Sequence, residues 1–297
     1  MSVGRNRAAS AALLAPSVGL IGVFILLPIV LTIWLSFNDW STQTAFSDAQ
    51  FAGLANYGEL FGDGPVGRDF RQATVNTFAY AGMSIALILP LSIAFGLFVY
   101  RVSLRSTLLL RTTLFSTYIV PSIAAAIVWA KLYSPTEGPI NQILQWFGIG
   151  AQPWLSSPDT ALGSLVILNV WQQVGYFTVL VIAGLTQIPG DVYEAAAIDG
   201  ARGFALFRRI TLPLLRNTML FTVVIALINA IQVFEPVVAI TQGGPVGATN
   251  VLTFHIRRVG IERAQGGLGS SMAVMLLLAL GLTVALIFAL FNRKDVR

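Results

Sequence analysis

The chain contains six apolar stretches, each long enough to cross the hydrocarbon core of a lipid bilayer. They lie at residues 11–37, 74–100, 113–134, 161–186, 217–240 and 268–292. A helix rises 1.5 Å per residue, so about 20 apolar residues span the core. Hydrophobic residues make up 56% of the 297 residues and charged residues 10%, which leaves too little polar surface for a soluble globule. The sequence predicts an all-α polytopic membrane protein with about six transmembrane helices in a single domain over residues 1–297.

The first apolar stretch follows Arg5 and Arg7, as the core of a secretory signal would. Its apolar run is too long for a signal, however, and no small-residue cleavage site follows before Asn38. We expect a retained span, in which Pro16 and Pro28 introduce kinks or mark the ends.

The basic residues between the stretches predict which side of the membrane each loop faces. One side of a six-span arrangement carries Arg5, Arg7, Arg101, Arg105, Arg111, Arg202, Arg208, Arg209, Arg216, Arg293, Lys294 and Arg297. The other side carries Arg68, Arg71, Arg257, Arg258 and Arg263. Because Lys and Arg accumulate in cytoplasmic loops, we expect a multi-pass protein of the cytoplasmic (inner) membrane, with both termini and the 187–216 loop in the cytoplasm. The basic residues are scattered between spans, so no nucleic-acid partner is predicted.

The composition also limits the chemistry that the chain can perform. It has no cysteine, and the single His255 cannot form a metal site by itself. No phosphate-binding GxxxxGK[ST] loop occurs, so any ATP-driven work requires another subunit. An intramembrane enzyme is disfavoured because the sequence has no HExxH pair and no paired intramembrane carboxylates. We predict a chain that is not an enzyme and binds no cofactor or metal.

Two of the apolar stretches carry polar side chains at helical spacing. The polar residues are Asn169, Gln172, Gln173 and Tyr176 in the fourth stretch, and Asn229, Gln232 and Glu235 in the fifth. The first set falls at i, i+3, i+4 and i+7, which is one helix face, and the second steps by three residues. Helix rise places both near mid-membrane.

These stripes fit either of two roles. Buried amides can join helices in a bundle, or they can line a path for a polar solute such as a sugar. Glu235 favours the path, because an ionisable group within a span is costly and seldom idle. Lys131, near the outer end of the third stretch, can extend its ammonium outwards or pair with Glu235.

Two loops on the outer side are long. Residues 38–73 are long enough for a small folded cap or a short helix, or they form an ordered loop over the span ends. Residues 135–160 include Trp146 and Trp154, which we expect at interfacial depth.

Residues 191–215, DVYEAAAIDGARGFALFRRITLPLL, form the longest segment between spans that has the features of ordered helix. Asp191 and Glu194 have the spacing of a capping box at a helix start. Gly200 suits a left-handed helix end, and a second helical piece follows as far as Pro213. A helix, a turn and a second helix are predicted.

Several positions of this segment resemble the EAA loop of permease subunits of ABC importers. They are Glu194, Ala195, Ala196, Asp199, Gly200, Ala201, Ile210, Leu212 and Pro213. A second group resembles the carbohydrate-uptake branch, in particular the first permease of maltose-type importers: Phe234, Glu235, Thr241, Gly243, Gly244 and Pro245. The likeness extends from about residue 53 to the C-terminus.

The resemblance implies the type I ABC importer permease fold. It also implies partners: a second permease subunit, two ATPase subunits that use ATP and Mg, and an extracytoplasmic solute-binding protein. The residues implied in ATPase coupling are Glu194, Ala195, Ala196, Asp199, Gly200, Ala201, Phe207 and Pro213. Without the resemblance, the segment could be an ordinary connector.

The expected function is to form half of a translocation pathway for a sugar or related polyhydroxylated solute. The sequence does not identify the solute, and an importer of glycerol phosphodiesters or of another polar solute stays open. A membrane scaffold without transport would explain the 191–215 segment but not the polar stripes.

Overall fold

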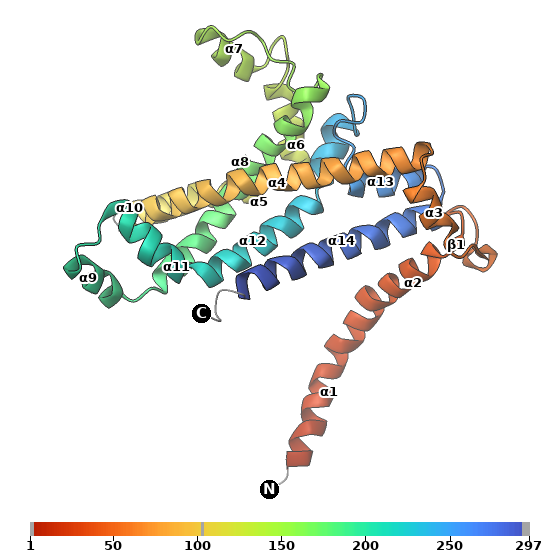
Figure 1. Cartoon of the computed structure of the whole chain (residues 1–297), viewed down its shortest axis with the longest axis horizontal. Helices are drawn as coiled ribbons and strands as arrows, with labels where there is room; N and C mark the ends of the chain where they lie inside the picture. Colours follow the sequence, from red (N-terminus) through yellow and green to blue (C-terminus); the bar gives the residue numbers. More distant parts are fainter. Residues whose placement is uncertain (1–2, 102–103, 293–297) are drawn as a thin grey trace. The chain divides into compact units, whose positions relative to one another are not determined.

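The computed structural model describes residues 3–101 and 104–292, with side chains for residues 10–101 and 109–291. Nearly all described segments are helical (Figure 1). The α-helices are α1 (Val3–Ile21), α2 (Leu27–Ser36), α3 (Ala55–Phe61), α4 (Pro65–Tyr100), α5 (Leu104–Ile119), α6 (Ser122–Leu132), α7 (Pro139–Trp146), α8 (Pro158–Thr186), α9 (Gly190–Ile198), α10 (Gly203–Leu206), α11 (Leu212–Leu214), α12 (Arg216–Ile231), α13 (Leu252–Arg257) and α14 (Gly266–Asn292). The all-α prediction is confirmed.

Shorter elements lie between these helices. Four are π-helical turns, η1 (Gly22–Leu26), η3 (Phe207–Thr211), η4 (Val237–Thr241) and η5 (Arg258–Glu262), and η2 (Phe46–Asp48) is a 3-10 turn. The two short strands are β1 (Asn38–Asp39) and β2 (Gln50–Phe51), which pair antiparallel. The chain divides into two compact units, residues 1–70 with 255–279 and residues 71–254 with 280–297. The single domain expected over residues 1–297 stays a prediction.

Four continuous helical segments are long and apolar enough to cross a membrane. They are Ser10–Ser36, Pro65–Tyr100, Pro158–Thr186 and Gly266–Phe291. Two further helix pairs pass the same test only together: Leu109–Ile119 with Ser122–Leu132, bent by 94°, and Gly203–Leu214 with Arg216–Ile231, bent by 73°. The described residues therefore contain four to six spans, in agreement with the expected number.

The third and fifth spans differ from the continuous helices expected at 113–134 and 217–240. Pro121 separates α5 from α6, and its ring restricts Val120 to extended backbone. In the fifth span, α12 ends at Ile231, and helical structure resumes at Glu235 with Pro236 in its first turn, where a missing N–H costs no intrahelical bond. A proline therefore lies at the interruption of the third span and at the point where the fifth span resumes.

In the first unit, the segment after α2 forms a small cap made of β1, η2, β2 and the short helix α3, so it contains both the folded cap and the short helix that were expected as alternatives. The backbone N–H of Thr42 donates to Ala264 O at 3.2 Å, and that of Gly267 donates to Trp40 O at 3.0 Å. The Asn56 amide donates to Ser36 O and Asn38 O, both at 3.0 Å. These bonds fix the segment against the start of α14.

In the second unit, α8 is the central helix and packs against α5, α6 and α12 (Figure 1). At Gly175 the α5 backbone comes so close that a Cβ atom would lie 1.7 Å from Leu114 O. An apolar cluster of Val181, Leu185, Ile188, Leu215 and Met219 continues this packing towards the end of α8. This rigid helix positions the polar residues of the fourth span.

Candidate functional site

A polar hollow of about 440 Å³ lies beside the α5–α6 break and the end of α12. Its walls come from the α5–α6 break, from the middle of α8 and from the end of α12. The lining residues are Tyr118, Ile119, Val120, Pro121, Ser122, Gln172, Gln173, Asn229, Gln232 and Glu235. Five of the seven polar residues expected along a solute path therefore lie around one space.

Gln172 closes the inner wall of this hollow by holding the α5–α6 break. The side chain is buried, and its amide N–H groups donate to Val120 O at 2.8 Å and to Ser122 Oγ at 3.2 Å. The last carbonyls of a helix have no partner within that helix, and Gln172 supplies one at the end of α5. Its amide nitrogen is committed to the backbone of a neighbouring helix.

The other three polar residues of α8 have different surroundings. Gln173 lines the hollow, and its Oε1 is buried with no hydrogen-bond donor among the described residues. Tyr176 stacks on Tyr118, with ring centroids 4.5 Å apart and planes 17° apart. Asn169 is half-buried and does not line the hollow. One helix face thus supplies a structural amide, a second amide that borders the hollow and an aromatic support.

The polar residues of the fifth span do not form the single helix face that their spacing predicts. Asn229 lies within α12, Gln232 follows its last residue, and Glu235 lies beyond the break. The expected stripe is wrong because it assumed a helix that continues to residue 240. All three side chains are exposed and still reach the hollow, because the chain turns around it.

The hollow also includes residues outside the two predicted polar stripes, chiefly Tyr118 and Ser122. The Val120-Pro121 dipeptide is the sequence signal that could have located them, since it predicts a helix break within an apolar span. Lys131 is exposed in the last turn of α6, and no ion pair between Lys131 and Glu235 occurs among the described side chains.

The segment resembling an EAA loop forms α9, α10, η3 and α11. The expected capping box is absent, since α9 begins at Gly190 after Pro189 and receives no side-chain cap. Asp191 lies in the first helical turn instead of before it. The expected left-handed end is present: Gly200 has φ 79°, and Ala201 N–H donates to Ala196 O at 2.9 Å. Asp199 is the C-terminal cap residue of α9.

One side of α9 is anchored and the other is exposed. Val192 and Tyr193 pack against the apolar cluster at the end of α8, and Tyr193 Oη donates to Thr211 Oγ1 at 3.4 Å. Ala196 is buried, whereas Glu194 and Ala195 are exposed. Ile198, which is not among the positions that resemble the EAA loop, is also exposed, to 87%. An exposed isoleucine on an anchored helix suits contact with a partner.

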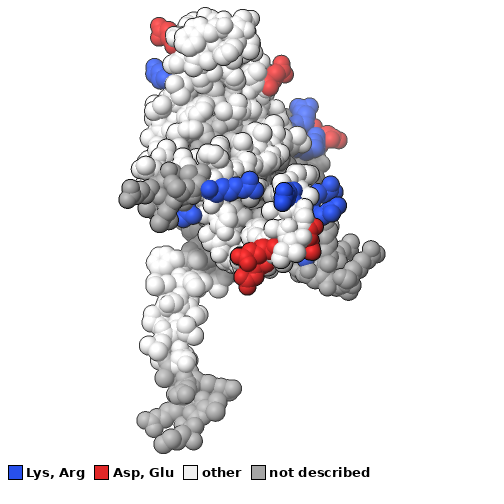
Figure 2. Space-filling model, turned by 90° about the vertical axis from the view of Figure 1, so that its left-hand side faces the viewer, with Lys and Arg blue, Asp and Glu red and all other residues white. Residues whose placement is uncertain are grey.

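The second half of the segment carries an exposed aromatic residue and several arginines. Phe204 is exposed, and its ring centroid lies 6.2 Å from that of Phe207. Phe204, Ala205, Arg208 and Arg209 line a shallow hollow of about 470 Å³. Lys and Arg side chains form a band on this face of the molecule, and a group of Asp and Glu side chains lies beside it (Figure 2). The bend lies between Leu214 and Arg216, just beyond the expected break at Pro213.

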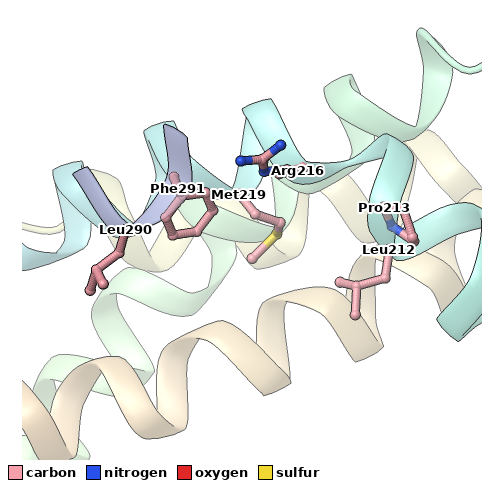
Figure 3. Close-up of a pocket in the computed structure, with 6 residues that line it drawn as sticks. All are labelled: Leu212, Pro213, Arg216, Met219, Leu290 and Phe291. Atoms are coloured by element: carbon pink, nitrogen blue, oxygen red, sulfur yellow. The ribbon is translucent and has the colours of Figure 1, made fainter. Parts of the chain in front are cut away.

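The start of α12 contributes to a separate cavity of about 580 Å³. It is lined by Leu212, Pro213, Arg216, Met219, Leu290 and Phe291, and Figure 3 shows Met219 and Phe291 on neighbouring helices beside it. Five of these six side chains are apolar, so this cavity is larger than the polar hollow but less suited to a polar solute. Pro213 lies in its wall.

Comparisons with known proteins show the family to which the chain belongs. Residues 88–295 match the family described as binding-protein-dependent transport system inner membrane component. The chain belongs to this family. It is accordingly a multi-pass membrane protein, as the apolar helices predict.

Curated members of the family are similar along nearly the whole chain. The trehalose/maltose transport system permease protein of Thermococcus litoralis is 32% identical over 95% of this chain and 94% of its own length. The diacetylchitobiose uptake system permease protein of Streptomyces coelicolor is 30% identical over 91% of this chain and 78% of its own. Both are named as transport permeases.

The fold also has a counterpart among solved structures. A chain of a bacterial ABC transporter involved in the import of the acidic polysaccharide alginate superposes with a TM-score of 0.82 at 22% identity. The match covers 97% of this chain and 96% of that chain. A second structure of an alginate transporter, in complex with an alginate pentasaccharide-bound periplasmic protein, gives the same TM-score. The expected ABC importer permease fold is confirmed.

Proposed function

We propose that this chain is the permease subunit of an ATP-driven importer and that its polar hollow forms part of the solute path. The observation that carries the proposal is the convergence of Gln173, Gln232 and Glu235 at the breaks of two spans. Polar groups at such breaks can hydrogen-bond a hydroxylated solute, and irregular backbone at membrane depth is tolerated where it lines a cavity.

The proposed solute is a sugar or a related polyhydroxylated compound. Amide groups and tyrosine rings suit hydroxyl groups and the apolar faces of sugar rings. The lining of the hollow includes one carboxylate, that of Glu235, and neither Lys nor Arg. This charge balance disfavours glycerol phosphodiesters, which would leave an anion beside Glu235 without a compensating cation. The names of the trehalose/maltose and diacetylchitobiose relatives point in the same direction.

The proposed coupling element is the anchored α9 with the turn that follows it. Glu194, Ala195 and Ile198 form its exposed side, and the Gly200 turn sets the direction of α10. Because α9 is packed against the end of α8, movement of a bound ATPase subunit would reach the spans without being absorbed by a flexible loop. Asp199, Ala201, Phe207 and Pro213 maintain the shape of this element, while Ala196 packs inwards.

The proposed assembly contains a second permease, two ATPase subunits that use ATP and Mg, and an extracytoplasmic solute-binding protein. In this assembly both termini and the 187–216 loop face the cytoplasm, as the distribution of Lys and Arg favours. The periplasmic protein in the second alginate structure and the family description support the binding-protein partner.

Uptake by the reconstituted assembly tests the proposed path. Gln173→Ala should reduce uptake of a radiolabelled disaccharide because it removes the amide that faces the hollow. Asn169→Ala is the matched control, since Asn169 lies one helical turn away on α8 and outside the hollow. Equal uptake by both variants and the wild type, at equal assembly, would contradict the assignment of the hollow. A panel of neutral and anionic solutes then tests the solute class.

A further inference from the structure

Helix α7 presents an apolar face that no described part of the chain covers. Trp146 is 82% exposed and Phe147 76%, and Ile143, on the same side of the helix, is also exposed. Residues three and four apart share a helix face, so Ile143, Trp146 and Phe147 form one continuous surface. We call these three residues the α7 face.

The helix that carries this face is firmly held. Asn141, on the opposite side of α7, is buried and uses its whole amide group. Its Nδ2 donates to Pro135 O at 3.3 Å and Gln152 O at 3.1 Å, and its Oδ1 accepts from Gln152 N at 3.0 Å and Trp154 Nε1 at 2.9 Å. The α7 face is therefore exposed on a helix that is held in place by hydrogen bonds.

The same bonds separate the two tryptophans of this loop. The Trp154 indole donates to Asn141, and its ring centroid lies 5.3 Å from that of Tyr133, so this residue belongs to the interior of the loop. Trp154, which was expected at interfacial depth, therefore also helps to hold this loop together. Trp146 remains as the indole that can contact a surrounding medium.

The chemistry around the α7 face selects a lipid surface as its partner. Residues 138–158 contain no charged side chain. Six residues separate the end of α6, the second half of a broken span, from the start of α7, so α7 must lie close to the membrane. Tryptophan is enriched at membrane–water interfaces, and helices with one apolar face lie along them.

We propose that α7 lies in the outer interface of the bilayer and inserts the α7 face among the lipid headgroups and upper acyl chains. The inserted α7 face would hold in place the end of α6 that leads to α7. The other end of α6 begins at the Pro121 break that lines the polar hollow. The proposal goes beyond transport and does not depend on which solute is carried.

The absence of cysteine makes site-directed spin labelling a direct test. Single-cysteine variants Ile143→Cys and Phe147→Cys report on the α7 face, and Gln145→Cys on the same helix is the matched control. Gln145 is exposed but lies about 160° from Ile143 around the helix, at 100° per residue. The full chain, labelled with a nitroxide, is reconstituted into phosphatidylcholine vesicles, and accessibility to oxygen and to a water-soluble nickel chelate is measured by power saturation.

Labels at residues 143 and 147 should be several-fold more accessible to oxygen, relative to the nickel chelate, than the label at residue 145. A nickel-accessible label at all three positions would show that the face is in water and would overturn the proposal. A label shielded from both reagents would show that protein covers the face and would overturn it as well.

Tryptophan fluorescence gives a second test without a label. Brominated lipids should quench the wild type more than Trp146→Phe, because this substitution removes an indole that contacts lipid. An equal absolute loss of fluorescence in the two proteins, at equal protein concentration, would contradict the proposal.

Discussion

The fourth span and the two broken spans place polar side chains within the membrane in opposite ways. Helix α8 is continuous, central and about half buried, and its Gln172 supplies a hydrogen-bond donor to a neighbouring helix end. The third and fifth spans are interrupted near Pro121 and Pro236, and their exposed polar groups gather at the interruptions. The comparison teaches that an unbroken helix supplies the frame, whereas the breaks create the polar space.

The largest expected effect comes from disturbing the frame. In Gly175→Val, the new side chain would collide with the Leu114 carbonyl, which lies 1.7 Å from the Cβ position. We expect α5 and α8 to separate and the yield of folded protein to fall severely, as measured by size-exclusion chromatography in detergent. Gly163→Val on the same helix is the control, because no atom lies within 4 Å of its Cβ position. Similar yields of the two variants would contradict close packing of α5 on α8.

A smaller effect is expected from substituting two adjacent residues of α8, one of which holds the helices together while the other borders the proposed solute path. Gln172→Ala leaves the Val120 carbonyl without its donor, and losing a buried hydrogen-bond partner costs about 1–3 kcal/mol of folding free energy. Gln173→Ala removes no hydrogen bond between described residues and should leave thermal stability nearly unchanged while uptake falls. Thermal unfolding of both variants is the measurement, and equal destabilisation would remove the distinction.

The sequence predicted the frame better than the breaks. The 3.6-residue periodicity correctly places Gln172, Gln173 and Tyr176 on one side of α8, since that helix is continuous. The same reasoning failed for Asn229, Gln232 and Glu235, because α12 ends at Ile231 and does not continue to residue 240 as their spacing assumed. Only tertiary structure brings Tyr118 and Ser122 to the same hollow. At α9, Gly200 predicted the helix end correctly, but Pro189 moved the start and removed the expected capping box.

The α9 turn extends the comparison from the spans to the proposed coupling element. Gly200 has φ 79°, and a branched residue in left-handed backbone costs roughly 1 kcal/mol or more. No described atom lies within 4 Å of the Gly200 Cβ position, so Gly200→Val acts through backbone strain alone. We expect this strain to redirect α10 and weaken ATPase attachment. Co-purification of the ATPase is the measurement. Gly190→Val is the control at the start of α9, and wild-type attachment in Gly200→Val would make the segment a mere connector.

A pH-dependent effect is expected outside both broken spans, at His255. Burial chiefly, and then the charge of Arg258, lower the pKa of His255 to about 4, against the opposing effect of Asp69. Below pH 6.5 the unfolded chain gains a proton that the folded chain does not, so stability should decline gradually from pH 6.5 towards pH 4. Above pH 6.5 this contribution should be constant.

Thermal unfolding as a function of pH measures this effect. His255→Asn should flatten the decline between pH 6.5 and 4, whereas Gln173→Ala should retain it. An unchanged decline in His255→Asn would assign the pH dependence to other groups.

Chemical protection of single cysteines tests most directly whether the breaks form the solute path. Gln173→Cys and Gln232→Cys place thiols in the hollow of a chain that has no other cysteine, and Asn169→Cys places one outside it. In the reconstituted assembly, a water-soluble thiol reagent should modify residues 173 and 232, and a transported sugar should slow that reaction several-fold without affecting residue 169. Modification at 173 and 232 that is insensitive to every transported sugar would contradict the assignment of the hollow to the solute path.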